Sequence, residues 1–214
     1  MKEAIGKPER QDFPLLTGKE VLVQAEIDGC VGQAFTANPR EYKGPVAEVL
    51  RLSSDHPGNL ALQAATLNAL AKRVGLVDHT VHCRDTGPEL CAQAIARTVL
   101  ERHGKCRVGI IGYQPAILEN CASVFGPENV RITDLNPSNI GQTRYGVKVW
   151  NGENDTAKLA GFCDIFLVTG TVLTNGTFNG ISHLFEGKPV YFYGTTAAAF
   201  AVMNELPRLC EQSS

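Results

Sequence analysis

The sequence predicts an α/β protein with a Rossmann-like parallel sheet of about five strands over residues 105–214. A small α+β lobe over residues 1–104 precedes it. Residues 107–112 (RVGIIG) and 164–169 (DIFLVT) are short apolar runs, each followed by a loop that contains glycine and polar residues. Buried parallel strands have this pattern. Strand-type and helix-type segments also alternate from residue 104 onward, whereas a hairpin and helices come before.

In the first lobe, residues 1–18 form a leader in which we expect a short helix. Residues 20–28 alternate like a strand, Gly29 and Cys30 form a turn, and residues 31–37 are the hairpin partner. Residues 46–52 are a short strand or helix. A helix over 58–74 ends at Gly75, with its apolar face made by Leu60, Ala64, Leu67, Ala71 and Val74. A helix over 87–103 follows, with a stripe of Leu90, Ala94, Ile95, Thr98 and Val99.

In the second lobe we expect strands at 107–112, 130–134, 146–150, 164–169 and 189–193. A helix begins at Pro115, a residue suited to the first helical position. Further helices cover 156–162, a segment marked by Phe178 and closed by Gly187, and residues 197–205, capped by Thr195 or Thr196. If the strand order is 3-2-1-4-5, the loops after the first and fourth strands flank the topological switch point, where open sheets of this kind bind ligands.

Composition narrows the class of protein. The net charge is −2, and Lys and Arg are not clustered, so we expect no nucleic-acid partner. Apolar runs are too short for a membrane span and the N-terminus lacks a signal-peptide core, which makes the cytoplasm the expected location. The seven scattered cysteines fit no disulfide framework and no zinc motif, so we expect reduced, mostly buried thiols.

The first candidate binding segment is Gly112-Tyr113-Gln114-Pro115, between the first strand and its helix. A glycine and a helix N-terminus at this point can approach an anionic or polar ligand. The segment lacks the G-x-G-x-x-G pattern of dinucleotide sites, and an ordinary strand-to-helix turn is the alternative.

Further candidates follow the other strands. Asp134 ends the second strand at about the offset where related folds bind ribose hydroxyls, with Asn136 just beyond it. A strand-end Asp is also a common turn former. The loop 169–177 carries four threonines, an asparagine and two glycines, and either binds a polar ligand or caps the next helix through Asn175 or Thr177. The ligand contacts predicted there are Thr169, Gly170, Thr171, Asn175 and Thr177, and Thr195 continues the pattern after the fifth strand.

The local His/Cys cluster in the sequence is His79, His82 and Cys83, which could bind a transition metal. A solvated loop without a metal is the alternative. No catalytic Ser/His/Asp set, paired-carboxylate motif or P-loop is present in the sequence, so it names no nucleophile and no general base, and whether the protein is an enzyme stays open.

Three segments together resemble a family of uncharacterised bacterial and archaeal proteins named for heavy-metal chelation. They are 108–115, 132–137 (ITDLNP) and 164–177, and the resemblance covers about residues 104–205. Residues 58–70 (GNLALQAATLNAL) resemble the small domain that usually precedes this family, which is similar in fold to the N-terminal domain of enolases. We expect one departure from the family in the 38–57 loop, which the sequence predicts to be trimmed or rearranged.

The resemblance implies two lobes with a ligand cleft between them, formed by residues 112–115, Asp134, 169–171, Asn175 and Thr177. These segments are rich in oxygen and poor in sulfur, whereas soft heavy metals prefer thiolate and imidazole ligands. If the protein chelates a metal, the ligands therefore come from elsewhere, such as His82 and Cys83, or the metal arrives inside a chelating small molecule.

Three functions remain as hypotheses. The first is a small-molecule, metal or metal-chelate binding protein with its site in the cleft. The second is a transferase that uses S-adenosylmethionine or another nucleotide-like cofactor, with Asp134 on a ribose and Asn136 near an adenine. The third is a non-catalytic scaffold that forms homo-oligomers.

Overall fold

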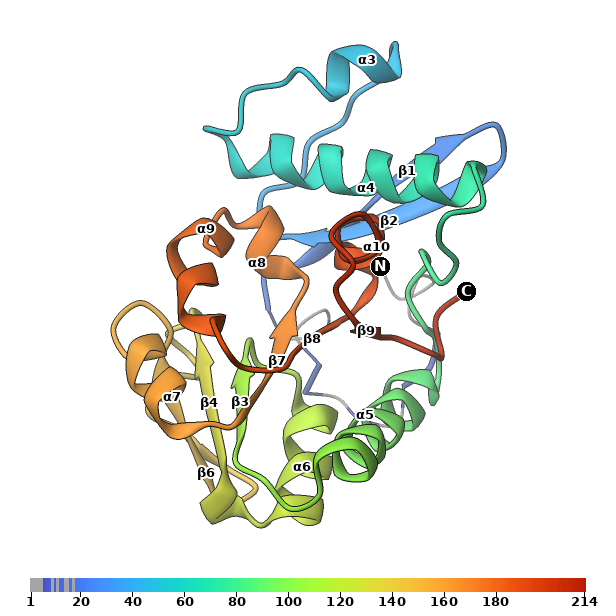
Figure 1. Cartoon of the computed structure of the whole chain (residues 1–214). Helices are drawn as coiled ribbons and strands as arrows, with labels where there is room; N and C mark the ends of the chain where they lie inside the picture. The colour runs from blue at the N-terminus through green and yellow to red at the C-terminus, as the bar shows by residue number, and fades with distance from the viewer. Residues whose placement is uncertain (1–5, 9, 11, 14–15, 17) are drawn as a thin grey trace.

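The computed structural model describes residues 6–8, 10, 12–13, 16 and 18–214. The expected leader at 1–18 therefore lies largely outside the described residues. Over the described part, a seven-stranded sheet has the order β5-β6-β4-β3-β7-β8-β9 and forms the centre of the second lobe (Figure 1). Its strands are β3 (Val108–Ile111), β4 (Val130–Asp134), β5 (Thr143–Arg144), β6 (Val147–Asn151), β7 (Ile165–Thr169), β8 (Val190–Tyr193) and β9 (Arg208–Leu209).

The five longer strands of this sheet are all parallel and confirm the predicted 3-2-1-4-5 order. The sheet is wider than expected because β5 pairs antiparallel with β6, and β9 pairs parallel with β8. Each of these edge strands has two residues, which is too short to produce a recognisable alternation of polar and apolar residues.

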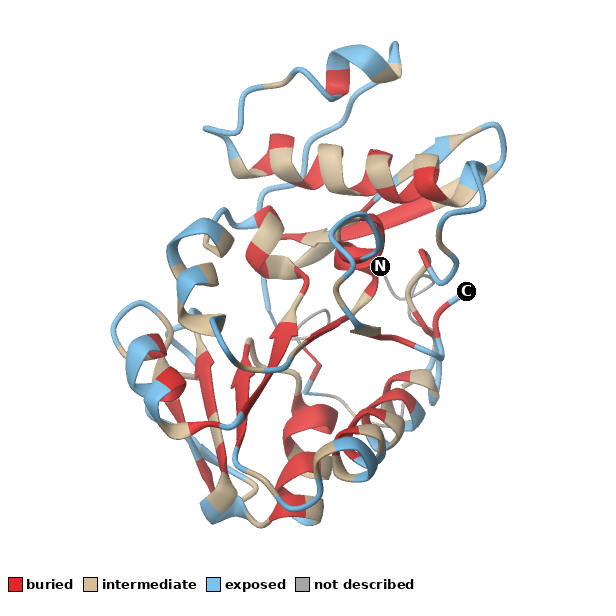
Figure 2. Cartoon of the chain, viewed as in Figure 1, coloured by how far each residue is buried: buried red, intermediate tan, exposed pale blue. Residues whose placement is uncertain are grey.

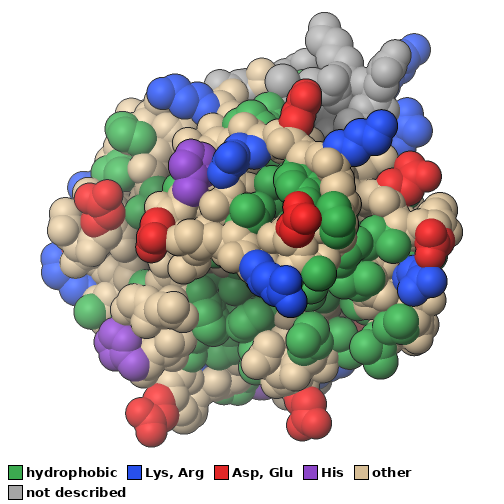
Figure 3. All heavy atoms as spheres, turned by 90° about the horizontal axis from the view of Figure 1, so that it is seen from above, with side chains coloured by type: hydrophobic (Ala, Val, Ile, Leu, Met, Phe, Trp, Pro, Cys, Tyr) green, Lys and Arg blue, Asp and Glu red, His purple; other side chains and the backbone are tan. Residues whose placement is uncertain are grey.

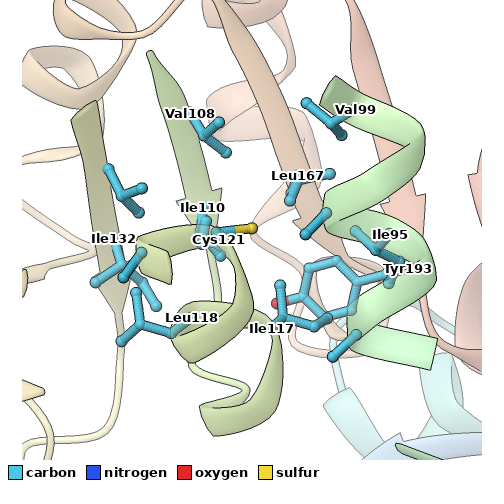
Figure 4. Close-up of a cluster of buried hydrophobic side chains, with 14 of the residues drawn as sticks. Ile95, Val99, Val108, Ile110, Ile117, Leu118, Cys121, Ile132, Leu167 and Tyr193 are labelled. Carbon is cyan, nitrogen blue, oxygen red and sulfur yellow. The ribbon is translucent and has the colours of Figure 1, made fainter. Parts of the chain in front are cut away.

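Helices cover both faces of the sheet. The helices α5 (Gly87–His103) and α6 (Pro115–Phe125) pack on one face, where Ile95, Ile110 and Ile117 belong to a single buried cluster (Figure 4). On the other face, α7 (Thr156–Phe162) joins a second cluster with the strand residues Phe166 and Phe192. The strands between these layers are buried almost throughout, which explains their continuous apolar runs (Figure 2).

The first lobe is a hairpin of β1 (Val21–Ile27) and β2 (Cys30–Thr36) packed under α4 (Pro57–Arg73). The predicted turn is shifted by one residue, because Asp28 and Gly29 both have positive φ, as a two-residue hairpin turn requires, and Cys30 already pairs in β2. At Gly32 the strand approaches the helix so closely that a Cβ would lie 2.3 Å from the Ala65 carbonyl oxygen.

The predicted apolar face of α4 is wrong by part of a turn. The buried face contains Ala61, Leu62, Ala65, Asn68 and Ala69, whereas Val74 is 61% exposed. The error arises because Asn68, which is 1% exposed, faces the interior although it is polar. In α5 the predicted stripe is also only partly buried, since Leu90 is 47% exposed.

Several shorter segments differ from expectation. The segment 46–52 contains the helix α3 (Val46–Val49), which lies within the 38–57 loop. The helix expected from Phe178 to Gly187 is divided into α9 (Phe178–Ile181) and the 3-10 turn η2 (Ser182–Phe185). The last helix is a 3-10 turn η3 (Thr195–Ala197) followed by α10 (Ala198–Met203). Neither Thr195 nor Thr196 caps it, because the Thr196 hydroxyl accepts the Phe35 amide instead.

The two lobes are joined through the backbone of Phe35 at the end of β2. Its N–H donates to Thr196 Oγ1 at 3.0 Å, and its carbonyl accepts from Thr174 Oγ1 at 2.8 Å. Thr174 ends α8 (Thr171–Thr174), the short helix after β7. The hairpin is therefore hydrogen-bonded directly to the loops after β7 and β8. The boundary at residue 104 stays a prediction, and α5, which precedes it, packs into the core of the sheet.

On the surface seen from above α3 and α4, side chains of Lys and Arg are interspersed with those of Asp and Glu, and hydrophobic side chains lie between them (Figure 3). Within the described residues, no helix has both the length and the apolar character needed to cross a membrane.

Candidate functional site

A cavity of about 1010 Å³ lies where the two lobes meet. Its wall combines the loops after β3, β4, β7 and β8 with the end of β2 and with residues from the start of α5. The loops after β3 and β7 belong to adjacent strands whose connections run to opposite sides of the sheet, so the cavity occupies the predicted topological switch point.

Most of the predicted ligand-binding residues lie in this wall. They are Gly112, Tyr113, Gln114, Asp134, Asn136, Thr169, Gly170, Thr171, Asn175 and Thr177. Two lie away from it: Pro115 is buried as the first residue of α6, and Thr195 is completely buried at the contact between the lobes. That these residues bind a ligand stays a prediction.

The backbone conformation and the close packing at residue 112 require a glycine. Its φ is +94°, and a Cβ there would lie 2.4 Å from Thr169 Cγ2, so the residue allows close approach to the end of β7. Its carbonyl accepts a hydrogen bond from the Tyr193 hydroxyl at 2.8 Å. The glycine therefore brings the ends of β3, β7 and β8 together, which shapes the floor of the cavity.

Two polar side chains at this edge hold the loops in place. Gln114 caps α6 by accepting the Ile117 amide at 2.6 Å. The Asp134 carboxylate accepts hydrogen bonds from the amides of Tyr113 at 2.8 Å and Asn136 at 2.9 Å, and from Asn139 Nδ2 at 3.0 Å. Asp134 therefore forms a turn, as one interpretation predicts, and it also lines the cavity, while ribose binding by its carboxylate stays a prediction.

Residues of the threonine-rich loop after β7 form hydrogen bonds with one another. Asn175 Oδ1 accepts the amide of Thr177 at 3.1 Å and its hydroxyl at 2.7 Å, and the hydroxyls of Thr169 and Thr171 are 3.1 Å apart. Thr177 occupies the position before α9 without a side-chain cap bond. The hydroxyls of Thr169 and Thr171 remain at the cavity wall, where they can donate to or accept from a ligand.

Sequence reasoning missed an acidic residue in the cavity. Glu20, just before β1, lines the wall, and burial, with a smaller contribution from the Asp134 carboxylate, raises its pKa. Burial also raises the pKa of Tyr193, and Asp134 adds to the effect. Glu20 comes from the other lobe, and its local sequence carries no signal that would place it beside Asp134.

The structure separates the three predicted metal ligands. His82 and Cys83 line the cavity, whereas the ring of His79 hydrogen-bonds to the Ser213 carbonyl. Among the described residues, no group of three or more His, Cys, Asp or Glu side chains is arranged to hold a metal ion.

The environment of His82 is unusual for an imidazole. Its ring meets Phe35 edge-on at 5.1 Å, and Nδ1 is buried without a well-formed hydrogen bond to any described residue. Burial lowers the pKa of His82 to about 4, although the Cys83 backbone partly opposes this. The ring is therefore neutral at physiological pH.

Two further cysteines, Cys91 and Cys210, also line the cavity together with Cys83. The three are far apart in the sequence, and no spacing motif connects them. Cys91 lies on α5, while Cys210 follows β9, one of the strands that the sequence did not predict. All seven cysteines of the chain are free thiols in the structure.

Comparison with solved structures shows the same fold in two proteins of unknown function from the DUF364 family. The protein from Pyrococcus horikoshii is 14% identical with a TM-score of 0.58, covering 84% of this chain and 69% of that one. The protein from Desulfitobacterium hafniense is 15% identical with a TM-score of 0.58, covering 94% of this chain and 78% of that one. At this identity the likeness concerns the fold alone.

No functionally curated protein matches the chain in sequence. A family model does match residues 95–207, which is more than half of the chain and includes the loops after β3, β4, β7 and β8. The resemblance carried by the three segments is thereby confirmed. The chain belongs to the DUF364 family, whose description reads "Putative heavy-metal chelation".

Proposed function

We propose that this protein binds a polar small molecule, free or as a metal chelate, in the cavity between its lobes. The observation that carries the proposal is the cavity itself: about 1010 Å³ at the topological switch point, with most of the predicted polar residues in its wall. Ligand pockets have this size and this position in open α/β sheets.

The charges in the wall favour one class of ligand. Glu20, Asp134 and Glu153 are acidic, and Lys19 is the basic side chain among the described lining residues. A ligand with several phosphate groups would meet more negative than positive charge. A neutral ligand, or one whose metal ion offsets its carboxylates, suits this wall better.

The donor atoms in the cavity wall indicate whether a metal ion would be bound directly or inside a chelating molecule. The loops after β3, β4 and β7 offer hydroxyl, amide and carboxylate groups, and soft heavy metals prefer sulfur and imidazole. These loops would therefore contact the organic part of a chelate, which brings the ligands of its metal with it. The family description is consistent with such a cargo.

Native mass spectrometry and elemental analysis of protein purified without chelators test the proposal. We expect an organic mass adduct, with or without stoichiometric metal, and we expect Thr171→Val and Asn175→Ala to lose it. Asn179→Ala is the matched control, because Asn179 is exposed on α9 and does not line the cavity. The proposal fails if both site variants keep the adduct. It also fails if the protein is empty and Co²⁺–citrate or Ni²⁺–citrate does not raise its Tm.

The position of Asp134 keeps the transferase hypothesis as a second candidate. Asp134 lies in the wall at the end of β4, as that hypothesis requires, with Asn136 beside it. Its carboxylate already accepts three hydrogen bonds from the protein, so a ribose would share its remaining acceptor capacity. An adduct with the mass of a nucleoside derivative, lost in Asp134→Ala, would support this candidate over the chelate.

A further inference from the structure

The sulfur of Cys210 lies among an unusual number of hydrogen-bond donors. The Ser213 hydroxyl donates to the Cys210 carbonyl at 2.7 Å and also lies 3.2 Å from Sγ, and the Gly194 amide and the Cys91 thiol interact with the same sulfur. The Arg208 guanidinium adds a hydrogen bond and a positive charge. Donors and a cation around one sulfur stabilise a thiolate, which is the reactive form of cysteine.

The position of Arg208 strengthens this point. Its guanidinium is fixed by the carbonyls of Asp78 at 2.9 Å and His79 at 3.1 Å. Within the described part of the chain, no carboxylate forms an ion pair with it; burial lowers its pKa, and Cys210 and Cys91 oppose this effect. A partly buried cation needs a counter-charge, which a thiolate at Cys210 would supply.

The cysteines near this sulfur differ in character. Hydrogen bonding from Cys91 outweighs burial and, with the positive charge of Arg208 and hydrogen bonding from Ser213, lowers the pKa of Cys210, while the same contact with Cys210 and burial raise the pKa of Cys91. Burial raises the pKa of Cys83 to about 12. Cys210 is therefore the more acidic cysteine of this pair, and both line the cavity.

We propose that Cys210 and Cys91 form a reactive dithiol that exchanges with low-molecular-weight disulfides entering the cavity. The Cys210 thiolate attacks one sulfur of the disulfide RSSR, forming a mixed disulfide and releasing RS⁻, which takes up a proton. Cys91 then loses its proton and attacks the Cys210 sulfur, and the second RS⁻ leaves. The protein loses two electrons and the Cys91 proton, solvent supplies the second proton, and RSSR becomes two RSH. This site does not depend on the ligand proposed above.

The test uses oxidised glutathione and the full-length protein. We expect wild type to release two glutathione molecules and to contain a Cys91–Cys210 disulfide by peptide mapping. Cys91→Ser should stop at the mixed disulfide on Cys210, and Cys210→Ser should give neither product. Cys83→Ser is the control within the cavity and Cys30→Ser, on the hairpin, the control outside it, and both should behave as wild type.

The assignment is overturned if Cys210→Ser still forms the disulfide, or if Cys83→Ser abolishes it. A measurement on wild type alone avoids dependence on variant folding. Brief alkylation with iodoacetamide, mapped by mass spectrometry, should label Cys210 before the other cysteines at mildly acidic pH. Arg208→Met should shift this labelling to higher pH, and Arg208→Lys should partly restore it. Equal labelling of all cavity cysteines would contradict the proposal.

Thiol exchange and ligand binding are separable in these experiments. Thr171→Val and Asn175→Ala should leave the exchange with glutathione unchanged, because neither residue contacts the dithiol. Cys210→Ser should in turn keep the organic adduct if both proposals hold. Loss of one activity alone therefore identifies which proposal has failed.

Discussion

The carboxamide of Asn68 on α4 accepts the backbone amide of Ala199 on α10 at 2.8 Å, which ties the first lobe to the last helix of the chain. The same side chain donates to the carbonyls of Gln33 at 2.9 Å and Thr195 at 3.0 Å. One buried amide therefore satisfies backbone groups from β2, η3 and α10. This contact sets the position of the loop after β8, which forms part of the cavity wall.

Replacing Asn68 with alanine should destabilise the protein strongly. The change removes the Asn68 partner of the Ala199 amide and of the Gln33 carbonyl and one of the two donors to the Thr195 carbonyl, and we expect a loss of about 3 kcal/mol in the free energy of unfolding. Urea denaturation measures it. Asn204→Ala is the matched control, because Asn204 is exposed and its loss should cost less than about 0.5 kcal/mol. Equal effects of the two substitutions would show that Asn68 does not join the lobes in solution.

The parts of the fold that the sequence predicts are those with local, repeated patterns. Four-residue and five-residue apolar runs such as β3 and β7 identify buried parallel strands, and Pro115 and Gly104 mark helix ends. The face of α4 is harder to predict, because its buried side combines apolar residues with Asn68, whose burial follows from hydrogen bonding. Asn68 is buried since its amide has partners in three other segments, and no local pattern contains that information.

Some residues of the candidate site could likewise be predicted from the sequence, and others could not. Loops after parallel strands gather at one edge of a sheet by topology alone, so Gly112, Asp134 and Thr169 could be placed together from their sequence positions. Glu20 and Cys210 could not, because they enter from the N-terminal lobe and from the segment after β9. Their neighbours are set by how the lobes dock, which depends on contacts distant in the sequence.

The close packing at Gly170 gives a prediction about the shape of the cavity. A Cβ at this residue would lie 2.7 Å from the Ala197 amide nitrogen, so Gly170→Ala should push apart the loops after β7 and β8. We expect a cost of about 1–3 kcal/mol in unfolding free energy and weaker retention of the adduct. Gly180→Ala is the control, because Gly180 also lines the cavity but has open space around it. If the two variants retain the adduct equally, the spacing of these loops does not matter for binding.

Burial of His82 predicts sensitivity to acid. Its pKa is about 4 in the folded protein against an ordinary histidine pKa of 6.5, so the unfolded chain takes up the proton first as the pH falls. The stability present above pH 6.5 should therefore decline between this pH and about 4, by up to about 2 kcal/mol at pH 5. Urea denaturation at pH 7 and at pH 5 should show a smaller decline for His82→Gln than for wild type. The exposed His183 provides the control, and a decline that His183→Gln reduces as much would contradict the assignment.

Glu20 should show the opposite dependence on pH. Its pKa is raised above 4.5 in the folded protein, so its carboxyl group ionises first in the unfolded chain as the pH rises. Stability is then greatest below this pH and declines as the pH rises through the folded pKa. Glu20→Gln should have a higher Tm than wild type at neutral pH, and the two should converge in acid. Glu26→Gln, which removes an exposed carboxylate on β1, should show no such gain.

The contribution of Asp134 to this effect can be separated by a double-mutant cycle. Because the Asp134 carboxylate raises the pKa of Glu20 in addition to burial, the gain from Glu20→Gln should shrink when Asp134 is already replaced by asparagine. A gain that is unchanged in the Asp134→Asn background would mean that burial alone acts on Glu20. A reduced gain would show that the two carboxylates face one another across the junction of the lobes, where a cationic or metal-bearing ligand would relieve their repulsion.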